Sequence, residues 1–456
     1  MKTFEGWEWY RMEHYDVIIV GSGLAGLTAA LELTTNGKKV LILEKEKVIG
    51  GRTSSWDEDG MVVESGFHRH IGYYKALPQV LKKVGVNIDA IVQWEENIDV
   101  RIKGKKDAIT FGVSPIFGPL DMIKGILGNN DILSWKDKLS FLRFFTSGFL
   151  QYLKNPDALD QFNIRDYATK HNVSENALHY AVIPLSAGIF FLPPERYSAK
   201  VFFGLFFPAI PRFYRMRVGA YLGGMTELLA RPIAQFVEFQ NGVIKTGTKV
   251  LSLVFENEAV IGVILEEGSK IYAKDIILAT HLGGTKEILK KHFIDHPSLE
   301  NLFKLPTMPA VTIQMEFTKP VLPYDRTTFG PLTSLASFAE QSRSTFTHVQ
   351  GRLSIILTPP EAFLNMESKD ILKHVQKEAR ELGLDLETNL IDYRIVSRSD
   401  DFYSLEPNLD HLRPNQKTEI KGLTLAGDYT RQPYYATMEG AVVSGLKAAN
   451  LILKKN

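Results

Sequence analysis

Cysteine is absent from the chain of 456 residues. This absence excludes disulfides, thiolate metal sites, a cysteine nucleophile and a thioether-linked cofactor. No run of apolar residues reaches the roughly 18 that a membrane-spanning helix needs. The first 14 residues have no apolar core, so we expect a short extension there and no secretory signal. Together these absences predict a cytoplasmic protein that could contact a membrane peripherally.

An excess of either charge is missing as well. Lys and Arg number 53 and Asp and Glu number 52, which gives a formal net charge of +1. A chain with this balance offers no general attraction to nucleic acid, so we expect no nucleic-acid partner. The length exceeds what one simple core accommodates, so two domains are expected, and they could be discontinuous in sequence.

The clearest motif lies near the N-terminus. Residues 15–20, YDVIIV, predict a buried parallel strand, and the glycines Gly21, Gly23 and Gly26 follow at once. A helical pattern comes next, and a second apolar strand ends at Glu44. Strand, glycines, helix, strand and acid in this order are typical of a dinucleotide-binding βαβ unit.

Each position of this unit has its own physical role. Gly21 permits a tight turn, Gly23 lets the backbone approach a pyrophosphate, and Gly26 lets helix and strand pack closely. The helix N-terminus offers free N–H groups to the phosphates. Glu44 can accept hydrogen bonds from a ribose diol. We expect the flanking Ser22, Ala25 and Lys45 to contact the dinucleotide too. The alternative is a glycine turn without a ligand.

The element VIGGRTSS, residues 48–55, indicates which dinucleotide binds. Gly50 and Gly51 allow close backbone approach, and Arg52 can pair with a phosphate. The element resembles the GGR segment of the flavin amine oxidase and carotenoid desaturase superfamily, in which it contacts FAD. This resemblance implies FAD as the cofactor. An ordinary glycine turn with a surface arginine is the alternative.

The C-terminal stretch GDYTRQPYYATMEGA extends this resemblance. Together with DGMVVESGFHRHIGYYKALPQVLKKVG, it looks most like the plant and cyanobacterial type phytoene and ζ-carotene desaturases. The resemblance implies that Gly427 and Asp428 meet the cofactor, with Asp428 accepting hydrogen bonds from the ribityl hydroxyls. The helix that begins at Met438 to Ala441 would then point its N–H groups at the pyrimidine end of the flavin. A turn and a helix N-terminus without a ligand would give the same pattern.

The resemblance spans nearly the whole chain and implies an α/β fold. A Rossmann-type FAD-binding domain would be assembled from residues 14–75, 220–288 and 418–456. An inserted α+β substrate domain would comprise residues 76–219, which are mostly helical and apolar, and residues 289–417. Val250 aligns with a residue whose backbone meets the adenine, although a valine there also suits a strand core.

The sequence departs from the amine oxidases at one position. These usually place an aromatic residue directly before MEGA, where it forms one wall of a cage around the substrate amine. Ala436 and Thr437 stand here instead. Tyr434 and Tyr435 could supply an aromatic wall, although packing is the commoner role of such a pair. The loop residues His68 and Arg69 also differ from the more aromatic loop of the plant desaturases.

Phenylalanine is concentrated between residues 114 and 215, for example in VFFGLFFPAIP. A lipophilic substrate tunnel would use these side chains. So would an apolar patch on a bilayer, with Arg212, Arg215 and Arg217 nearby. The helical core of the second domain is the alternative.

These features predict an oxidoreductase with non-covalently bound FAD that desaturates a long isoprenoid or carotenoid. A C–H next to a double bond would lose hydride to flavin N5 and the next carbon a proton, with quinone or oxygen as final acceptor. Four of the histidines, His68, His70, His179 and His281, are scattered without triad or metal spacing, so no metal is expected. His68 is the candidate for a polar group near the flavin, although a structural role is an alternative.

Three other functions remain open at this point. A flavin amine oxidase is one, and Thr437 speaks against it. A redox-neutral FAD-dependent isomerase or dehydroxylase of an isoprenoid is another. A non-catalytic FAD- or lipid-binding protein is the third.

Overall fold

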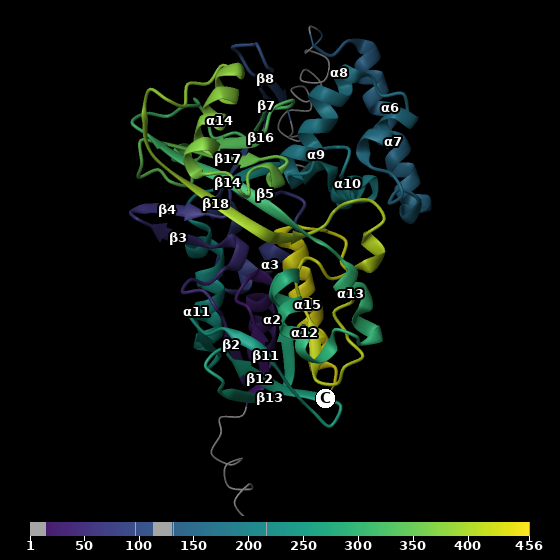
Figure 1. Cartoon of the computed structure of the whole chain (residues 1–456), viewed down its shortest axis with the longest axis vertical. Coiled ribbons are helices and arrows are strands. Elements are labelled where there is room, and N and C mark those ends of the chain that lie inside the picture. Colours follow the sequence, from purple (N-terminus) through teal and green to yellow (C-terminus); the bar gives the residue numbers. More distant parts are fainter. Residues whose placement is uncertain (1–14, 96, 113–129, 131, 216, 456) are drawn as a thin grey trace, which may run out of the picture.

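Two seven-stranded sheets form the frame of the molecule (Figure 1). The structure, a computed structural model, describes residues 15–95, 97–112, 130, 132–215 and 217–455. The expected N-terminal extension and the first part of the expected helical block, up to residue 129, lie outside these residues. No helix in the described part of the chain is long and apolar enough to cross a bilayer.

The first sheet collects strands from three separate stretches of sequence. Its order is β10-β2-β1-β13-β12-β11, and β19 pairs with β13. The strands are β1 (Tyr15–Val20), β2 (Val40–Leu43), β10 (Val243–Lys245), β11 (Val250–Glu256), β12 (Ala259–Leu265), β13 (Lys270–Leu278) and β19 (Leu423–Leu425). β10, β2, β1, β13 and β19 run parallel, whereas β11 and β12 pair antiparallel. The two strands predicted around the glycines are confirmed, and the second ends one residue before Glu44.

Four helices share one apolar core on this sheet: α2 (Leu24–Thr35), α3 (Ala76–Lys83), α11 (Arg231–Phe239) and α15 (Met438–Leu453). Small residues allow their close approach. A Cβ added at Gly26 would lie 2.0 Å from the carbonyl oxygen of Gly21, and one at Gly445 would lie 2.3 Å from that of Ala25. The helix α12 (Leu282–Phe293) packs on β11. This packing brings the C-terminal helix against the first helix of the βαβ unit.

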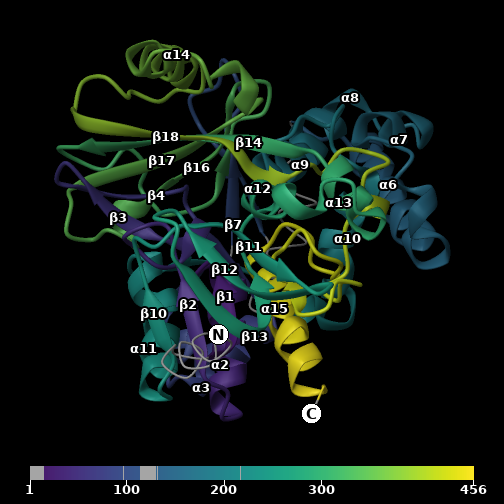
Figure 2. The same cartoon turned by 60° about the horizontal axis from the view of Figure 1, so that its bottom comes forward.

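The second sheet has the order β18-β14-β17-β16-β15-β7-β8. Its strands are β7 (Asn97–Val100), β8 (Ile109–Gly112), β14 (Thr307–Phe317), β15 (Thr328–Phe329), β16 (Leu335–Glu340), β17 (Gly351–Leu357) and β18 (Leu390–Tyr403). One face is covered by α14 (Ser368–Glu381) (Figure 2). Ile371, Val375 and Ala379 of this helix share a buried core with Val311 and Ile313 of β14. The other face of this sheet is not covered by α14 and can therefore face the first sheet.

A helical region adjoins both sheets. Its helices are α6 (Trp135–Lys154), α7 (Ile164–Lys170), α8 (Glu175–Ala177), α9 (Ile183–Phe190) and α10 (Ala199–Phe206). The rings of Phe144, Phe202 and Phe203 are fully buried and contact one another with centroids 5.1 to 5.9 Å apart. The helical character predicted for this region is confirmed within the described residues.

Smaller elements connect these layers. β3 (Ser55–Glu58) and β4 (Met61–Glu64) form a hairpin, which turns at Asp59 and Gly60, and β7 with β8 forms another. The short helices are α4 (Ile88–Ile91) and α13 (Glu300–Lys304). The loop expected at His68 and Arg69 is partly wrong, because residues 69–71 form β5. β5 pairs with β9 (Val218–Tyr221), which also pairs with β6 (Val92–Glu95), and such distant pairing leaves no local signal.

The predicted fold class is confirmed, since a mixed α/β Rossmann-type sheet receives strands from three segments separated by α+β insertions. The domain boundaries stay a prediction. The boundary after residue 288 falls inside α12, and the boundary after residue 75 separates α3 from the helices that share its core.

The contact between α6 and α10 generates a stability prediction. A Cβ added at Gly148 would lie 2.0 Å from Cζ of Phe203, whose ring is fully buried. We expect Gly148→Val to lower the free energy of unfolding by about 1–3 kcal/mol, because the ring cannot move without displacing its neighbours. Thr146→Val on the exposed side of the same helix is the control. Equal urea midpoints for the two variants would contradict this packing.

Candidate functional site

One large cavity lies at the edge of the first sheet where its parallel strands end. Its volume is about 2410 Å³, more than twice the roughly 1,000 Å³ that bounds most ligand pockets. Gly21, Glu44, Ala279 and Gly427, which directly or closely follow the carboxyl ends of β1, β2, β13 and β19, line it. Ligands of open α/β sheets bind at such an edge. The cavity thus has room for a large cofactor and a substrate together.

The predicted cofactor residues, distant in sequence, come together here. All of them line the cavity except Ser22 and Gly26. Those that line it are Gly21, Gly23, Ala25, Glu44, Lys45, Gly50, Gly51, Arg52, Val250, Gly427, Asp428, Met438 and Ala441. Their contact with a cofactor stays a prediction.

The turn that contains Gly21 and Gly23, here called the glycine corner, has the geometry that a pyrophosphate site needs. Gly21 has a φ of +103°, and a Cβ there would lie 2.9 Å from the carbonyl oxygen of Ala279. At Gly23 the nearest atom to an added Cβ is the carbonyl oxygen of Gly50, at 4.0 Å. A side chain at Gly23 would therefore enter the cavity, so glycine there leaves space for a ligand at the start of α2.

Ser22 supports the site from behind the glycine corner. Its backbone N–H and its hydroxyl both donate to Oε2 of Glu44, at 2.8 and 2.7 Å. Oε1 of Glu44 accepts from the backbone N–H of Glu46 at 3.0 Å. These bonds fix a buried carboxylate at the end of β2, where the expected ribose diol would meet it.

Arg52 and Asp428 meet directly, although 376 residues separate them. Nη2 of Arg52 lies 2.5 Å from Oδ1 of Asp428, and the guanidinium lies 4.9 Å from the centre of the Phe402 ring. Burial opposes the charge of Arg52, but Asp428 and Asp401 outweigh it, so the pKa of Arg52 is raised. Arg52 therefore stays protonated in the cavity wall, where Asp428 balances its charge.

The residues before α15 leave an open face on the cavity. Ala436 and Thr437 line it, whereas Tyr434 and Tyr435 do not. Tyr435 is buried, and its hydroxyl lies 3.3 Å from that of Tyr152. The Tyr pair thus supplies no aromatic wall, in agreement with the packing alternative. Oγ1 of Thr437 instead accepts from the N–H of Gly440 at 3.1 Å and caps the helix.

Glu439 explains how α15 is held at the cavity. Its carboxylate accepts hydrogen bonds from three backbone N–H groups at the start of α3. The donors are Lys75, Ala76 and Leu77, at 2.7, 2.6 and 2.9 Å. The otherwise unpaired donors of one helix are thereby satisfied by the first turn of another. The start of α15, which the resemblance places beside the flavin, is fixed by this contact.

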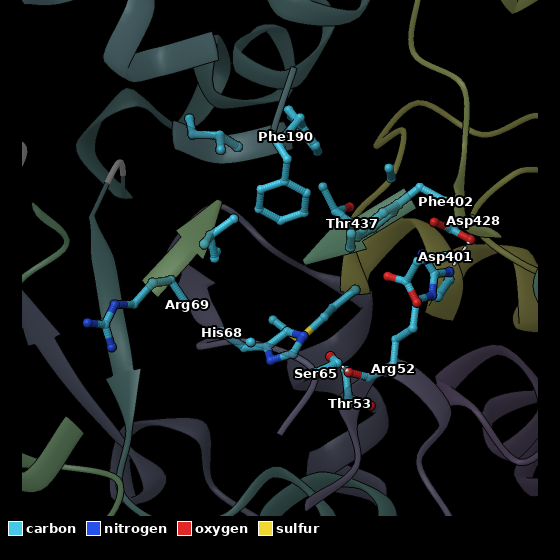
Figure 3. Close-up of a pocket in the computed structure, with 18 of the residues that line it drawn as sticks. Arg52, Thr53, Ser65, His68, Arg69, Phe190, Asp401, Phe402, Asp428 and Thr437 are labelled. Atoms are coloured by element: carbon cyan, nitrogen blue, oxygen red, sulfur yellow. Dashed lines mark hydrogen bonds and ion pairs between the residues drawn. The ribbon is translucent and has the colours of Figure 1, made fainter. Parts of the chain in front are cut away.

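The histidines remain separated in space. His68 lines the cavity and, with Thr437 and Asp401, faces its open centre in Figure 3, and burial lowers its pKa to about 4. Its side chain is therefore neutral near pH 7, and its catalytic role stays a prediction. His70 is buried against Tyr221, with Nδ1 3.0 Å from the hydroxyl. His281 caps α12, and His179 lies near Glu175. No group of metal-binding side chains was found among the described residues.

The apolar side of the cavity comes from the helical region. Phe141, Phe145 and Phe149 of α6 line it, and so do Phe190 of α9 and Phe206 of α10. Figure 3 shows the Phe190 ring projecting toward the space above His68. Other phenylalanines, such as Phe144 and Phe203, form the core instead. The Phe-rich block therefore contributes both to the cavity wall and to the helical core, and its role as a substrate tunnel stays a prediction.

Several residues of the cavity wall gave no recognisable signal in the sequence. Asp401 and Phe402 belong to β18, whose residues 395–402 all line the cavity, and nothing local marks them. Phe191, held at a φ of +64°, contacts Phe402 with ring centroids 5.4 Å apart. His281 and Gly283 could have been suspected, because they follow a buried strand of the parallel sheet.

The fold and the cavity together are typical of a two-region protein that binds a dinucleotide. Comparison with protein families identifies which kind. The family described as flavin containing amine oxidoreductase matches residues 24–453, and the chain belongs to this family. The protein is therefore an FAD-dependent oxidoreductase.

Curated relatives include carotenoid desaturases. The chain is 27% identical to 15-cis-phytoene desaturase of Solanum lycopersicum over 458 residues, covering 96% of this chain and 78% of the relative. It is 28% identical to a probable ζ-carotene desaturase of Synechococcus elongatus, covering 96% of this chain and 98% of the relative. The resemblance proposed from the motifs is thereby confirmed.

Solved structures confirm the fold. Putrescine oxidase bound to putrescine has a TM-score of 0.75 at 16% identity, covering 97% of this chain and all of that one. An oxidoreductase from Methanosarcina mazei has a TM-score of 0.73 at 17% identity, covering 96% of this chain and 100% of that one.

The glycine corner gives a prediction for cofactor binding. We expect Gly23→Leu to abolish retention of FAD during purification, because its side chain would occupy the approach of the pyrophosphate. Gly223→Leu is the control, since a Cβ there meets only ordinary contacts with Leu228. The ratio of flavin to protein absorbance measures the effect. A flavin-replete Gly23→Leu protein would refute the assignment.

His70 gives a prediction for the pH dependence of stability. Burial lowers its pKa from 6.5 to about 3, so the unfolded state takes up its proton first as the pH falls. The stability that neutral His70 provides is complete above pH 6.5 and declines between 6.5 and 3. Between about pH 7.5 and about pH 5, we expect the free energy of unfolding of the apoprotein to fall by about 2 kcal/mol more than that of the His70→Gln variant. Urea unfolding at both pH values measures this difference.

Tyr221→Phe provides the matched control for this experiment. It removes the hydrogen bond to His70 but leaves the imidazole in its buried position. We expect Tyr221→Phe to lower the free energy of unfolding at every pH. The dependence of that free energy on pH should stay as in the unmodified protein. If the free energy of unfolding of His70→Gln depended on pH as that of the unmodified protein does, the buried neutral imidazole would not be the cause of this dependence.

Proposed function

We propose that this protein desaturates a long, apolar isoprenoid or carotenoid of the phytoene or ζ-carotene type, with FAD bound non-covalently. The observation that carries the proposal is the composition of the large cavity. One end has the glycine corner, Glu44 and the Arg52–Asp428 pair, and the other end has aromatic side chains from α6, α9 and α10. The names of the curated relatives favour the same substrate class.

The cavity residues present fit FAD. Gly23 leaves space beside the N-terminus of α2, Glu44 can receive a ribose, and Arg52 can meet a phosphate. The start of α15 provides free N–H groups for the electron-rich end of the flavin. Bound FAD supplies the hydride acceptor.

The chain's own contribution is to position the substrate and keep water away. Rings at Phe141, Phe145 and Phe190 can align an extended hydrocarbon toward Thr437, where the small side chains leave an open face. A hydrocarbon has no group to titrate, so catalysis would rest on orientation, and burial of apolar surface would drive binding. His68, neutral near pH 7, is the candidate for a polar group beside the reacting carbon.

A peripheral membrane site would suit a lipophilic substrate. The exposed side chains Trp135, Leu139, Leu142, Leu150 and Leu153 form one stripe along α6 and are between 52% and 63% exposed. Lys136, Arg143 and Lys154 on the same helix are also exposed. An apolar stripe with flanking cations is typical of helices that lie on anionic bilayers. We therefore propose a cytoplasmic protein that contacts a membrane, with a quinone or oxygen as electron acceptor.

Anaerobic mixing tests the reaction. Purified flavoprotein is incubated with phytoene, ζ-carotene or a simple amine, and the flavin absorbance and the products are followed. We expect bleaching by one of the polyenes together with a product that has one more double bond. Product formation without bleaching would indicate an isomerase or dehydroxylase. Bleaching by an amine alone would indicate an amine oxidase, and no response to any of them a binding protein.

A pair of isoleucines on α9 tests the apolar path. Ile189 and Ile183 are both half-buried, but only Ile189 lines the cavity. We expect Ile189→Gln to slow bleaching by the polyene about tenfold, because an amide would face hydrocarbon without a partner. Ile183→Gln should keep the rate within about twofold. Equal rates for both variants would show that the substrate does not pass α9.

A further inference from the structure

Asp401 is a carboxyl group in the cavity wall that receives no hydrogen bond from any of the described residues. Only 6% of the residue is exposed, and it lines the cavity. Nε of Arg398 forms an ion pair with Oδ1 of Asp401 at 3.9 Å, a distance too long for a hydrogen bond. Arg52 lies close enough to act on its charge but is already bonded to Asp428 at 2.5 Å. Figure 3 shows the carboxylate facing the open centre.

The adjacent Asp400 also lines the cavity, but it is exposed and hydrogen-bonded. Its side chain is 49% exposed, and its Oδ2 lies 3.1 Å from Nε2 of His281 at the start of α12. Asp401 is instead buried, and its ion pair with Arg398 is 3.9 Å long. Burial disfavours the charged form and raises the pKa of Asp401, whereas Arg52 and Arg398 favour the charge. A donor group of a molecule bound in the cavity would complete the hydrogen bonding of this side chain.

The chemistry of that donor follows from the proposed FAD and substrate, on which this inference rests. A polyene has no donor, and a pyrophosphate at neutral pH has none. The ribose hydroxyls are expected at Glu44, which lies at the end of β2 on the glycine side. The pyrimidine carbonyls are acceptors and are expected at the N–H groups that begin α15. The hydroxyls of the ribityl chain are donors between phosphate and flavin, and Asp401 lies beside the phosphate-binding candidate Arg52.

We propose that Asp401 accepts a hydrogen bond from the ribityl chain of FAD and so fixes the flavin relative to the apolar side of the cavity. Asp428 keeps Oδ2 as an acceptor while its Oδ1 is held by Arg52, and Asp401 would add a second carboxyl group on the other sheet. Asp401 is anchored on β18 of the second sheet, and its neighbour Phe402 packs against Phe191. The contact therefore ties the cofactor to the inserted region as well as to the Rossmann-type sheet.

Binding of two nucleotides to the full-length apoprotein tests the inference. FAD contains the ribityl chain, whereas ADP has the same adenosine diphosphate portion without it. We expect Asp401→Ala to weaken FAD binding about tenfold or more and to change ADP binding less than twofold, because a hydrogen bond to a charged group is lost only with FAD. Asp401→Asn keeps an acceptor oxygen and should lie between Asp401→Ala and the unmodified protein.

Asp392→Ala, on the same strand but outside the cavity lining, is the matched control and should leave both affinities within twofold of the unmodified protein. An unchanged FAD affinity in Asp401→Ala overturns the inference. Tighter binding of both nucleotides overturns it too, because Asp401 would then merely repel phosphate. Equal weakening of both overturns it, since Asp401 would then act through Arg52 or the fold. If Asp401→Ala does not fold, Asp401→Asn carries the test, with ADP affinity as its check on folding.

The outcome is independent of the proposed substrate. If FAD affinity changed in the Asp401 variants as expected but no polyene reduced the flavin, the desaturase proposal would be refuted and this inference would stand. If a polyene reduced the flavin but Asp401→Ala left the affinity for FAD unchanged, the desaturase proposal would stand and the inference about Asp401 would be refuted.

Discussion

The convergence of parallel strand ends is the constraint on which the site depends. β2, β1, β13 and β19 come from three regions of the chain but run in the same direction, so their carboxyl ends meet at one edge. The segments that follow these strands bring Glu44, Gly21 and Gly427 to the same cavity. Because parallel strands cannot be joined by tight turns, long insertions must separate them. Those insertions supply the rest of the cavity.

Two contacts then fix the pieces relative to one another. The ion pair of Arg52 and Asp428 joins the first and last segments of the sheet within the cavity wall. Glu439 joins the start of α15 to the start of α3 through three N–H groups. Each satisfies charged or polar groups that would be costly if left buried and alone. The MEGA motif therefore has a structural role at Glu439 in addition to its expected role beside the flavin.

The two ends of the cavity differ in chemistry, and the boundary between them lies near β18 and Thr437. Polar groups and helix N-termini surround the end formed by the Rossmann-type sheet, whereas phenylalanine rings surround the end formed by α6, α9 and α10. Small side chains at Ala436 and Thr437 leave the passage between these ends open. Asp401 and Phe402 stand at this passage on neighbouring positions of one strand. A polar cofactor and an apolar substrate can therefore meet there, each in its own surroundings.

Local sequence determined the βαβ unit, the glycine corner, Glu44, the GGR element and the start of α15, because turn chemistry, buried-strand composition and helix N-termini depend on residues close in the chain. The fold class and the family followed from these motifs. Only the tertiary structure decided that Tyr435 packs away from the cavity and that residues 69–71 form a strand. It also decided that Asp401 faces the centre with no hydrogen-bond donor among the described residues. Those facts depend on partners far away in sequence, such as Tyr152 and β9. Hydrophobic pattern and turn residues carry no record of such pairings.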